Sequence, residues 1–374
     1  MIYFDNAATG GRKPDCVLDA VSSAIKVCAN PGRSGHKLAL SCAAIVQECR
    51  NELDSFFGGY GYDRCVFTKN CTEALNIALF GILKQGDHVV VSCMEHNSVL
   101  RPLHDLKHRG IVTYDVCPLG DGGVSAKDIL VRLKPNTRAV VVTACSNVTG
   151  RIPDLLAIKQ ALPKHVLLIV DGAQGAGHRI INMQDMGIDA LAIAGHKGVF
   201  GIQGSGALLF SERVEPMPIM LGGTGSMSIL LESPNFYPDR LEAGTLAFPA
   251  IFSLLAGVRY LKRNEQEIYA KLLALTQYFL GGLQYLSAYQ VYSAPNTAGI
   301  VAFRHKKQES EAVATILSET FDIAVRGGLH CAPLMHEELG TLDFGLVRVS
   351  FSHFNSFDEI DELLNALSSI GKGN

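Results

Sequence analysis

The chain has 374 residues, a formal net charge of −3 at pH 7, 48% hydrophobic residues and 18% charged residues. This balance is typical of a soluble globular protein large enough to form two domains, and it lacks the basic excess of a nucleic-acid-binding protein. No apolar run reaches 18 residues, so the sequence predicts no membrane span. Residues 1–5 lack the basic and apolar regions of a signal peptide, and we therefore expect a cytoplasmic protein.

Short apolar runs alternate with helical segments along the first two thirds of the chain. A short strand near Tyr3 is followed by a helix from about Pro14, and residues 30–36 form a loop between two helices. The later expected strands cover residues 65–68, 87–93, 139–144, 166–171, 189–194 and 206–210. Helices are expected at 153–162 and from residues 69–74, which open the helix, to about residue 84. This alternation predicts a mostly parallel sheet with helices on both faces.

The last third of the chain predicts a second, smaller unit. A helical run is expected from about residue 249 to 263. It leads to an α+β unit with strands at 298–303 and 346–351 and helices at 310–320 and 358–369.

Polar residues follow several of these strands, where open α/β sheets bind ligands. Thr72 lies in the first turn of a helix, so it either caps that helix or helps the free N–H groups to hold an anion. His96 follows the strand at 87–93, where an imidazole can lie flat on a cofactor ring or be purely structural. Asn147 lies in the turn after the strand at 139–144. Each residue alone is a weak signal.

Lys197, in Gly195-His196-Lys197, follows a buried apolar strand. Because burying an ammonium ion is costly, Lys197 either points to solvent or is a desolvated amine ready to form a Schiff base with an aldehyde cofactor. Asp171 lies 26 residues earlier, directly after another apolar run. A carboxylate there can keep the nitrogen of a pyridine ring protonated, as pyridoxal phosphate chemistry requires. These two residues alone leave both interpretations open.

The ten cysteines are unevenly distributed, and only Cys331 lies after residue 145. No two are spaced as Cys-x-x-Cys, so we expect neither a zinc site nor a dithiol motif, and no metal. Most are expected to be small buried residues of a reduced compartment. Cys331 instead lies in a loop with two glycines, beside His330 and Arg326. A thiol in such surroundings can have a lowered pKa and act as a nucleophile.

Taken together, these motifs resemble the class V aminotransferase family of pyridoxal phosphate enzymes, specifically its cysteine desulfurase and selenocysteine lyase branch. The resembling motifs cover nearly the whole chain: Phe4-Asp5-Asn6-Ala7-Ala8, Asn70-Cys71-Thr72-Glu73-Ala74, Glu95-His96, Ser146-Asn147-Val148-Thr149-Gly150, Asp171-Gly172-Ala173-Gln174, Gly195-His196-Lys197, Glu242-Ala243-Gly244-Thr245, Arg326-Gly327-Gly328-Leu329-His330-Cys331-Ala332 and Arg348-Val349-Ser350-Phe351. The short loop before Cys331 resembles that of the second desulfurase group.

The resemblance implies the fold-type-I architecture of pyridoxal phosphate enzymes. Residues 15–248 would form a large cofactor-binding domain with a mostly parallel seven-stranded sheet between helices. Residues 1–14 and 249–374 would form the smaller α+β domain, which carries the Cys331 loop.

The resemblance also implies site roles. Lys197 would bond the cofactor and move protons, His96 would stack on its ring, and Cys331 would take the substrate sulfur. Asp171 would pair with the ring nitrogen and Gln174 with the ring hydroxyl. The remaining cofactor contacts implied are Cys71, Thr72 and His196 at the phosphate, Asn147 in the site, and Thr245 from the neighbouring subunit of a homodimer. The implied substrate-binding residues are Arg348, Asn147, Arg326 and His36.

The implied activity converts L-cysteine to L-alanine and leaves a persulfide on Cys331 for a sulfur-acceptor protein. A selenocysteine lyase, a carbon–sulfur lyase and a small-amino-acid aminotransferase stay open as alternatives, and a non-catalytic cofactor-binding scaffold or regulator is a more distant one. Two residues depart from the family pattern: Ala194 replaces a phosphate-binding serine, and Ala144 replaces a histidine.

Overall fold

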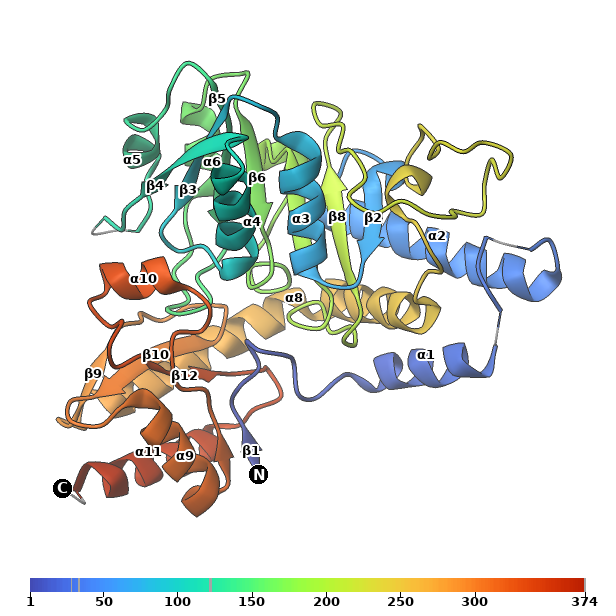
Figure 1. The fold of residues 1–374 in the computed structure, drawn as a ribbon. Helices are drawn as coiled ribbons and strands as arrows, with labels where there is room; N and C mark the ends of the chain where they lie inside the picture. The colour runs from blue at the N-terminus through green and yellow to red at the C-terminus, as the bar shows by residue number, and fades with distance from the viewer. Residues whose placement is uncertain (28, 33, 121–122, 373–374) are drawn as a thin grey trace.

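The computed structural model describes residues 1–27, 29–32, 34–120 and 123–372. A seven-stranded sheet forms the centre of its larger part (Figure 1). The strands lie in the order β2, β8, β7, β6, β5, β3, β4, and β8 runs antiparallel to both of its neighbours while the other pairs are parallel. Their bounds are β2 (Cys65–Thr68), β3 (Asp87–Ser92), β4 (Val112–Cys117), β5 (Thr137–Thr143), β6 (Leu167–Asp171), β7 (Ala190–Ala194) and β8 (Gly206–Phe210). The predicted mostly parallel sheet is confirmed.

Helices cover both faces of this sheet, and the strand side chains alternate between the two layers. Val140 and Leu168 belong to a core that includes residues of α2 and α6, whereas Val141 and Ile169 belong to one that includes residues of α3 and α4. Because both faces are buried, these strands are apolar throughout. The helices around the sheet include α2 (Lys37–Phe57), α3 (Cys71–Ile82), α4 (Asn97–His108), α5 (Ala126–Leu130), α6 (Leu155–Ala161) and α7 (Met183–Met186).

The long helix α8 (Phe248–Leu283) connects the two parts of the molecule (Figure 1). Its residues up to Val258 belong to a core of the large part, and those from Leu261 onward belong to the core of the small part. It also packs against α1 (Asp15–Lys26) and α2. The expected end of this helix at residue 263 is therefore wrong by about 20 residues.

The small part contains a three-stranded antiparallel sheet and a separate pair of short strands. The sheet has the order β12 (Val347–Ser350), β10 (Ile300–His305), β9 (Tyr289–Val291). The first strand, β1 (Ile2–Tyr3), pairs in parallel with β11 (Ile323–Ala324). The helices are α9 (Ser310–Phe321), α10 (Pro333–Glu338) and α11 (Phe357–Lys372), and short 3-10 turns lie at Tyr62–Arg64 and Asp239–Leu241. The predicted α+β character of this part is confirmed.

We propose the division into residues 15–248 and residues 1–14 with 249–374 as two domains joined by α8. In the described ranges, none of the helices combines the length and the apolar character needed to cross a bilayer. Cys28, one of the ten cysteines, and Arg33, in the loop at 30–36, lie outside the described residues.

Candidate active site

A cavity lies where β3, β5, β6 and β7 end, beside the first turn of α3. Parallel strands end at the same edge of a sheet, so this position brings together residues that are far apart in sequence. The lining residues are Asn70, Cys71, Thr72, His96, Ser98, Thr143, Asn147, Asp171, Ala173, Gln174, Ala194, His196 and Lys197. They include every residue predicted to bind a cofactor except Thr245.

Lys197 lines this cavity directly after β7. Burial lowers the pKa of its amine, and this effect exceeds the opposing influence of the Asp171 carboxylate. Within the described ranges, the amine has neither a hydrogen bond nor an ion pair. An unpartnered amine with a lowered pKa is a nucleophile that can react with an aldehyde. The structure therefore favours the desolvated-amine interpretation of Lys197.

Asp171, at the end of β6, is held through one of its two carboxylate oxygens. Oδ1 accepts hydrogen bonds from the backbone N–H of Ala173 at 2.8 Å and from the Cys71 thiol at 3.4 Å. Burial, followed by the charge of Asp171, raises the pKa of Cys71 well above its usual value, so the thiol stays a neutral donor. Oδ2 has no hydrogen-bond partner among the described residues. This oxygen can therefore accept a hydrogen bond from a molecule bound in the cavity.

The first turn of α3 presents free N–H groups to the cavity. Asn70 caps this helix, because its side chain accepts a hydrogen bond from the backbone N–H of Glu73 at 2.9 Å. Thr72 is therefore not the cap, and its hydroxyl lies 2.7 Å from the hydroxyl of Ser98. A 12-residue helix whose first N–H groups are free is suited to binding an anion. This location supports the anion-binding interpretation of Thr72.

Two histidines in the cavity wall are neutral. His96 Nδ1 accepts from the backbone N–H of Ser98 at 3.0 Å, and burial, reinforced by nearby Lys197, lowers its pKa to about 4. Burial also lowers the pKa of His196 to about 4, and its Nδ1 contacts the Thr9 hydroxyl at 3.0 Å. His96 caps α4 and also lines the cavity. The structural and cofactor-stacking interpretations of His96 are thus compatible.

The unsatisfied groups in this cavity fit the cofactor that the sequence implies. Gln174 donates through Nε2 to the carbonyl of Ala7 at 2.8 Å, while its Oε1 is buried without a partner. Gln174 Oε1, Asp171 Oδ2 and the free amine of Lys197 therefore match a small aromatic ring that carries a hydroxyl, a protonated nitrogen and an aldehyde, respectively. The N-terminus of α3 can hold a phosphate on that ring.

Arg348 on β12 is a buried arginine whose guanidinium group has one unused donor. Its Nη2 donates to Asp5 Oδ1 at 2.7 Å and its Nη1 to the carbonyl oxygen of Asn147 at 3.1 Å, while Nε is buried and unpartnered among the described residues. Arg326 pairs with Arg348 through backbone hydrogen bonds of 3.2 and 2.7 Å. The Arg326 guanidinium has no hydrogen-bond partner in the described part of the chain.

The loop that carries Cys331 is attached to the wall of the cavity. Asn147 donates through Nδ2 to the carbonyl oxygen of His330 at 2.7 Å. The backbone N–H of Asn97, the residue after His96, donates to the carbonyl oxygen of Cys331 at 2.7 Å. Cys331 itself is exposed, whereas seven of the other described cysteines are buried. The structure thus places an accessible thiol loop directly beside the cavity.

The comparison that decides the family is a match between residues 2–363 and the sequence profile described as aminotransferase class V. The chain belongs to the class V aminotransferase family. This class V protein is 34% identical to a probable cysteine desulfurase of Methanothermobacter thermautotrophicus, over 99% of this chain and 94% of the relative. A cysteine desulfurase of Thermococcus onnurineus, solved in the apo form, has a TM-score of 0.89 at 31% identity, covering 100% of this chain and 95% of that one. An Escherichia coli cysteine desulfurase, solved as an S-sulfonic acid, has a TM-score of 0.86 at 25% identity, covering 98% and 94%.

Besides Cys331, Arg326 and Arg348, two more predicted site residues of this class V protein are not among those that line the cavity. His36 is exposed and caps α2, accepting a hydrogen bond from the backbone N–H of Ala39 at 3.2 Å. Thr245 is exposed in the loop after Glu242. Of the two departures from the family pattern, Ala194 lines the cavity, whereas Ala144 packs closely against Gly175. Substrate binding by His36 and cofactor binding by Thr245 from the neighbouring subunit both stay predictions.

Sequence reasoning missed several residues that support the site. Glu95 is buried, accepts from the backbone N–H of Thr143 at 2.7 Å, and has a pKa raised to about 8, chiefly by burial and then by Asp171. Lys13 donates to the carbonyl oxygen of His196 at 2.8 Å, and burial lowers its pKa to about 8. The one available signal was that Glu95 directly precedes His96. Lys13 has no such signal, because its partner lies 183 residues away.

Proposed function

We propose that this class V aminotransferase is a pyridoxal-phosphate-dependent cysteine desulfurase that converts L-cysteine to L-alanine and leaves a persulfide on Cys331. The observation that carries the proposal is the exposed thiol of Cys331 on a loop bonded to Asn97 and Asn147, beside the cavity that contains Lys197. A carbon–sulfur lyase or an aminotransferase needs the cavity but no such thiol. The names of the relatives support the same activity.

Pyridoxal phosphate, when bound, supplies an electron sink for the negative charge that develops at the substrate Cα. Lys197 would attach it through its amine and then move the Cα proton. Asp171 Oδ2 would accept the ring N–H, and Gln174 Oε1 would accept the ring hydroxyl. The residues that would hold the phosphate are Thr72, His196 and the first N–H groups of α3, with His96 packed against the ring.

The substrate carboxylate would be bound by the two arginines together with Asn147. Arg348 already donates to Asp5 and Asn147, which leaves its Nε for another acceptor. Arg326 has an unpartnered guanidinium, and it is close enough to influence the pKa of both His96 and Lys197. We therefore propose that Arg326 contributes more to binding the substrate carboxylate than the resemblance alone implies. A planar guanidinium group can bind a carboxylate through two parallel hydrogen bonds.

The sulfur step is balanced without an external oxidant. The Cys331 thiolate forms a bond to the substrate sulfur, and the carbon–sulfur bond of the substrate breaks. The electron pair of that bond stays on carbon, which takes up a proton to become the methyl group of alanine. The products are alanine and one persulfide, from which a sulfur-acceptor protein in the cytoplasm would take the sulfur.

The test is to incubate the protein with pyridoxal phosphate and L-cysteine and to measure alanine together with the mass of the Cys331 peptide. Wild-type protein should release alanine and gain one sulfur on Cys331. Lys197→Ala should lose alanine release by more than the roughly 10²- to 10⁴-fold contribution of proton transfer alone, because cofactor attachment is lost as well. Cys331→Ala should keep the absorbance of the bound cofactor and lose sulfur transfer. Full desulfuration by Cys331→Ala would refute the assignment of the nucleophile.

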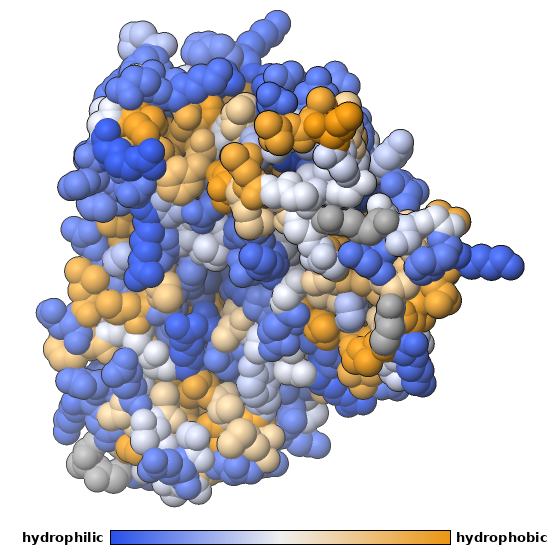
Figure 2. Space-filling view, turned by 45° about the vertical axis from the view of Figure 1, so that its right-hand side comes forward, coloured by the Kyte–Doolittle hydropathy of each residue, from blue (hydrophilic) through white to orange (hydrophobic). Residues whose placement is uncertain are grey.

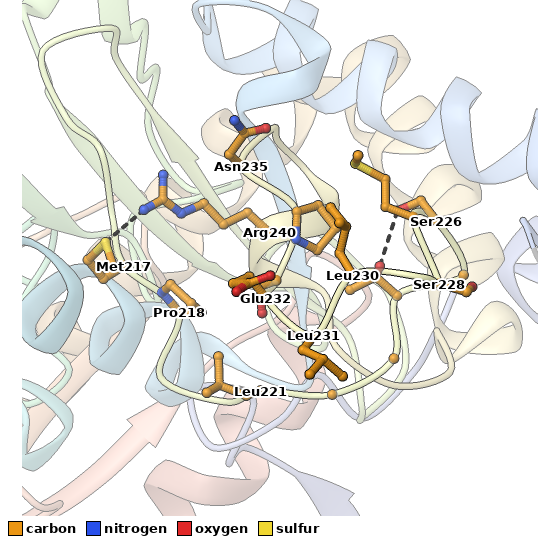
Figure 3. A pocket seen from close by; sticks show the side chains of 17 residues that line it. Met217, Pro218, Leu221, Ser226, Ser228, Leu230, Leu231, Glu232, Asn235 and Arg240 are labelled. Atoms are coloured by element: carbon orange, nitrogen blue, oxygen red, sulfur yellow. Dashed lines mark hydrogen bonds between the residues drawn. The ribbon is translucent and has the colours of Figure 1, made fainter.

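We further propose that the protein acts as a homodimer through the side formed by α2 and residues 217–236. Figure 2, which brings this side forward, shows hydrophobic patches among hydrophilic side chains. Ile229 and Leu231 are almost fully exposed, and Figure 3 shows Leu231 and Leu221 at the edge of a pocket across which Arg240 reaches Met217. Apolar exposure of this extent marks a protein contact surface. A partner seated there would lie beside Thr245.

Sedimentation velocity tests the dimer. Wild-type protein should sediment as a dimer, and Leu231→Glu should shift it toward monomer. Leu130→Glu is the matched control, because Leu130 is exposed on α5, at a distance from residues 217–236 (Figure 1). A wild-type monomer at the concentrations used for the activity assay would overturn the proposal.

A further inference from the structure

The loop that presents Cys331 has an uncommon backbone. His330 and Cys331 both adopt left-handed conformations, with φ values of 50° and 58°. Residues other than glycine rarely adopt this conformation, and they keep it only where their surroundings hold them. Histidine tolerates it better than most residues do. The shape of the loop must therefore be imposed by contacts on both sides of the thiol.

Three hydrogen bonds impose that shape. The carbonyl oxygen of His330 accepts from Asn147 Nδ2, and the carbonyl oxygen of Cys331 accepts from the backbone N–H of Asn97, both at 2.7 Å. The ring of His330 donates through Nε2 to the carbonyl oxygen of Leu346 at 3.0 Å. Leu346 directly precedes β12, which carries Arg348. The loop is thus tied to the cavity wall on one side and to the strand of the substrate-binding arginine on the other.

The His330 ring is suited to holding the loop and not to exchanging protons. It is only 2% exposed, and because a carbonyl oxygen can only accept, Nε2 carries the hydrogen. Nδ1 is buried with no partner among the described residues. Burial, followed by the charges of Arg348 and Arg326 and by nearby His336, lowers the pKa of His330 well below its usual value. These surroundings therefore favour the neutral form of the ring.

We propose that His330 is a positioning residue for the sulfur-accepting thiol, because its ring and its carbonyl group fix the left-handed conformation that presents Cys331. The inference rests on the proposed function, since it treats Cys331 as the sulfur acceptor. It adds that the thiol and Arg348 are held in one hydrogen-bonded unit, through Asn147 on one side and Leu346 on the other. The thiol and the substrate carboxylate would thereby keep a fixed relative position.

The experiment compares His330→Ala, His330→Asn and the control Leu329→Ala, which changes an exposed neighbour in the same loop. In a single turnover with L-cysteine, His330→Ala should form the Cys331 persulfide about 10- to 10²-fold more slowly, as expected for a displaced nucleophile. KM for cysteine should change by less than about threefold, and the cofactor absorbance should be unchanged. His330→Asn should recover part of the rate, because asparagine also tolerates the left-handed conformation. Leu329→Ala should behave as wild type.

Alkylation of Cys331 by iodoacetamide at several pH values separates positioning from proton transfer. The midpoint of the alkylation profile should be the same in wild type and His330→Ala, because the ring does not exchange the thiol proton. A shifted midpoint would overturn the inference, as would a wild-type rate of persulfide formation in His330→Ala. If that variant does not fold, a wild-type rate in His330→Asn overturns it equally. A wild-type protein that forms no persulfide would instead show that the proposed function itself is wrong.

Discussion

Replacing Glu242 with glutamine should destabilise the protein strongly, because it removes one charge from a buried ion pair. Arg50 donates to both carboxylate oxygens of Glu242, at 2.8 and 2.5 Å, and the two side chains are only 4% and 6% exposed. Glutamine keeps an acceptor for the backbone N–H of Phe67, which lies 2.6 Å from Glu242 Oε1, so the charge is the main loss. Breaking a buried pair from one side costs about 3–5 kcal/mol. With an unfolding entropy of roughly 2.1 cal/mol/K per residue, this corresponds to a fall in Tm of about 4–6 °C.

Thermal unfolding followed by circular dichroism measures this change. Glu48→Gln is the matched control, because Glu48 on α2 also pairs with an arginine, Arg259 of α8. That pair is partly exposed and is worth less than about 1 kcal/mol. The double variant Arg50→Met with Glu242→Leu should be more stable than Glu242→Gln, since it leaves no buried charge unpaired. A Tm for Glu242→Gln equal to that of Glu48→Gln would refute the reasoning. Because Thr245 follows in the same loop, Glu242→Gln should also weaken the proposed dimer.

Three further outcomes follow from the structure. Burial raises the pKa of Glu95 to about 8 from a value of 4.5, so between these pH values the folded state keeps a proton that the unfolded state loses, and stability falls as pH rises. The free energy of unfolding of Glu95→Gln, measured in urea, should therefore increase relative to that of wild type from about pH 5 to pH 8. A difference between the two proteins that does not vary with pH would contradict this. Gly175→Ala should lower the free energy of unfolding by about 1–3 kcal/mol, because the added Cβ would lie 2.4 Å from the Cβ of Ala144. The double variant Gly175→Ala with Ala144→Gly should have the Tm of wild type. Iodoacetamide should label Cys16 and Cys331 first among the described thiols, since the others are buried, and early modification of a buried cysteine in the mass spectrum would count against the structure.

The strands at the centre of the sheet are the elements that local sequence predicts best. β5 and β6 are apolar throughout because helices cover both of their faces. The edge strand β4 escapes prediction because exposed or partly exposed polar residues interrupt its apolar pattern. α8 is predicted too short because a polar stretch follows Leu261, although Leu261 and Ile268 continue the buried stripe of the helix. In the sequence, the polar stretch after Leu261 therefore looks like a helix end, although packing within the small part continues the helix through it.

The residues of the candidate site also divide into those that local sequence predicts and those that it does not. Lys197 and Asp171 are predictable because each is a polar residue at, or within three residues of, the end of an apolar strand. The ion pair between Asp5 and Arg348 is not, because it joins residues 343 positions apart and is set by how the small part folds. The left-handed conformation of His330 and Cys331 likewise depends on partners from α4 and from the turn after β5, and no local pattern reports it.

The parallel pairing of β1 with β11 has a consequence for synthesis of this protein on the ribosome. Ile2 and Tyr3 are synthesised before every strand of the central sheet, whereas their partners Ile323 and Ala324 are synthesised after all of them. During synthesis, β1 therefore lacks its pairing partner until the chain beyond the central sheet has been made. Thr9 and Lys13, which follow β1 in the chain, contact His196, so the same segment also forms part of the surroundings of Lys197.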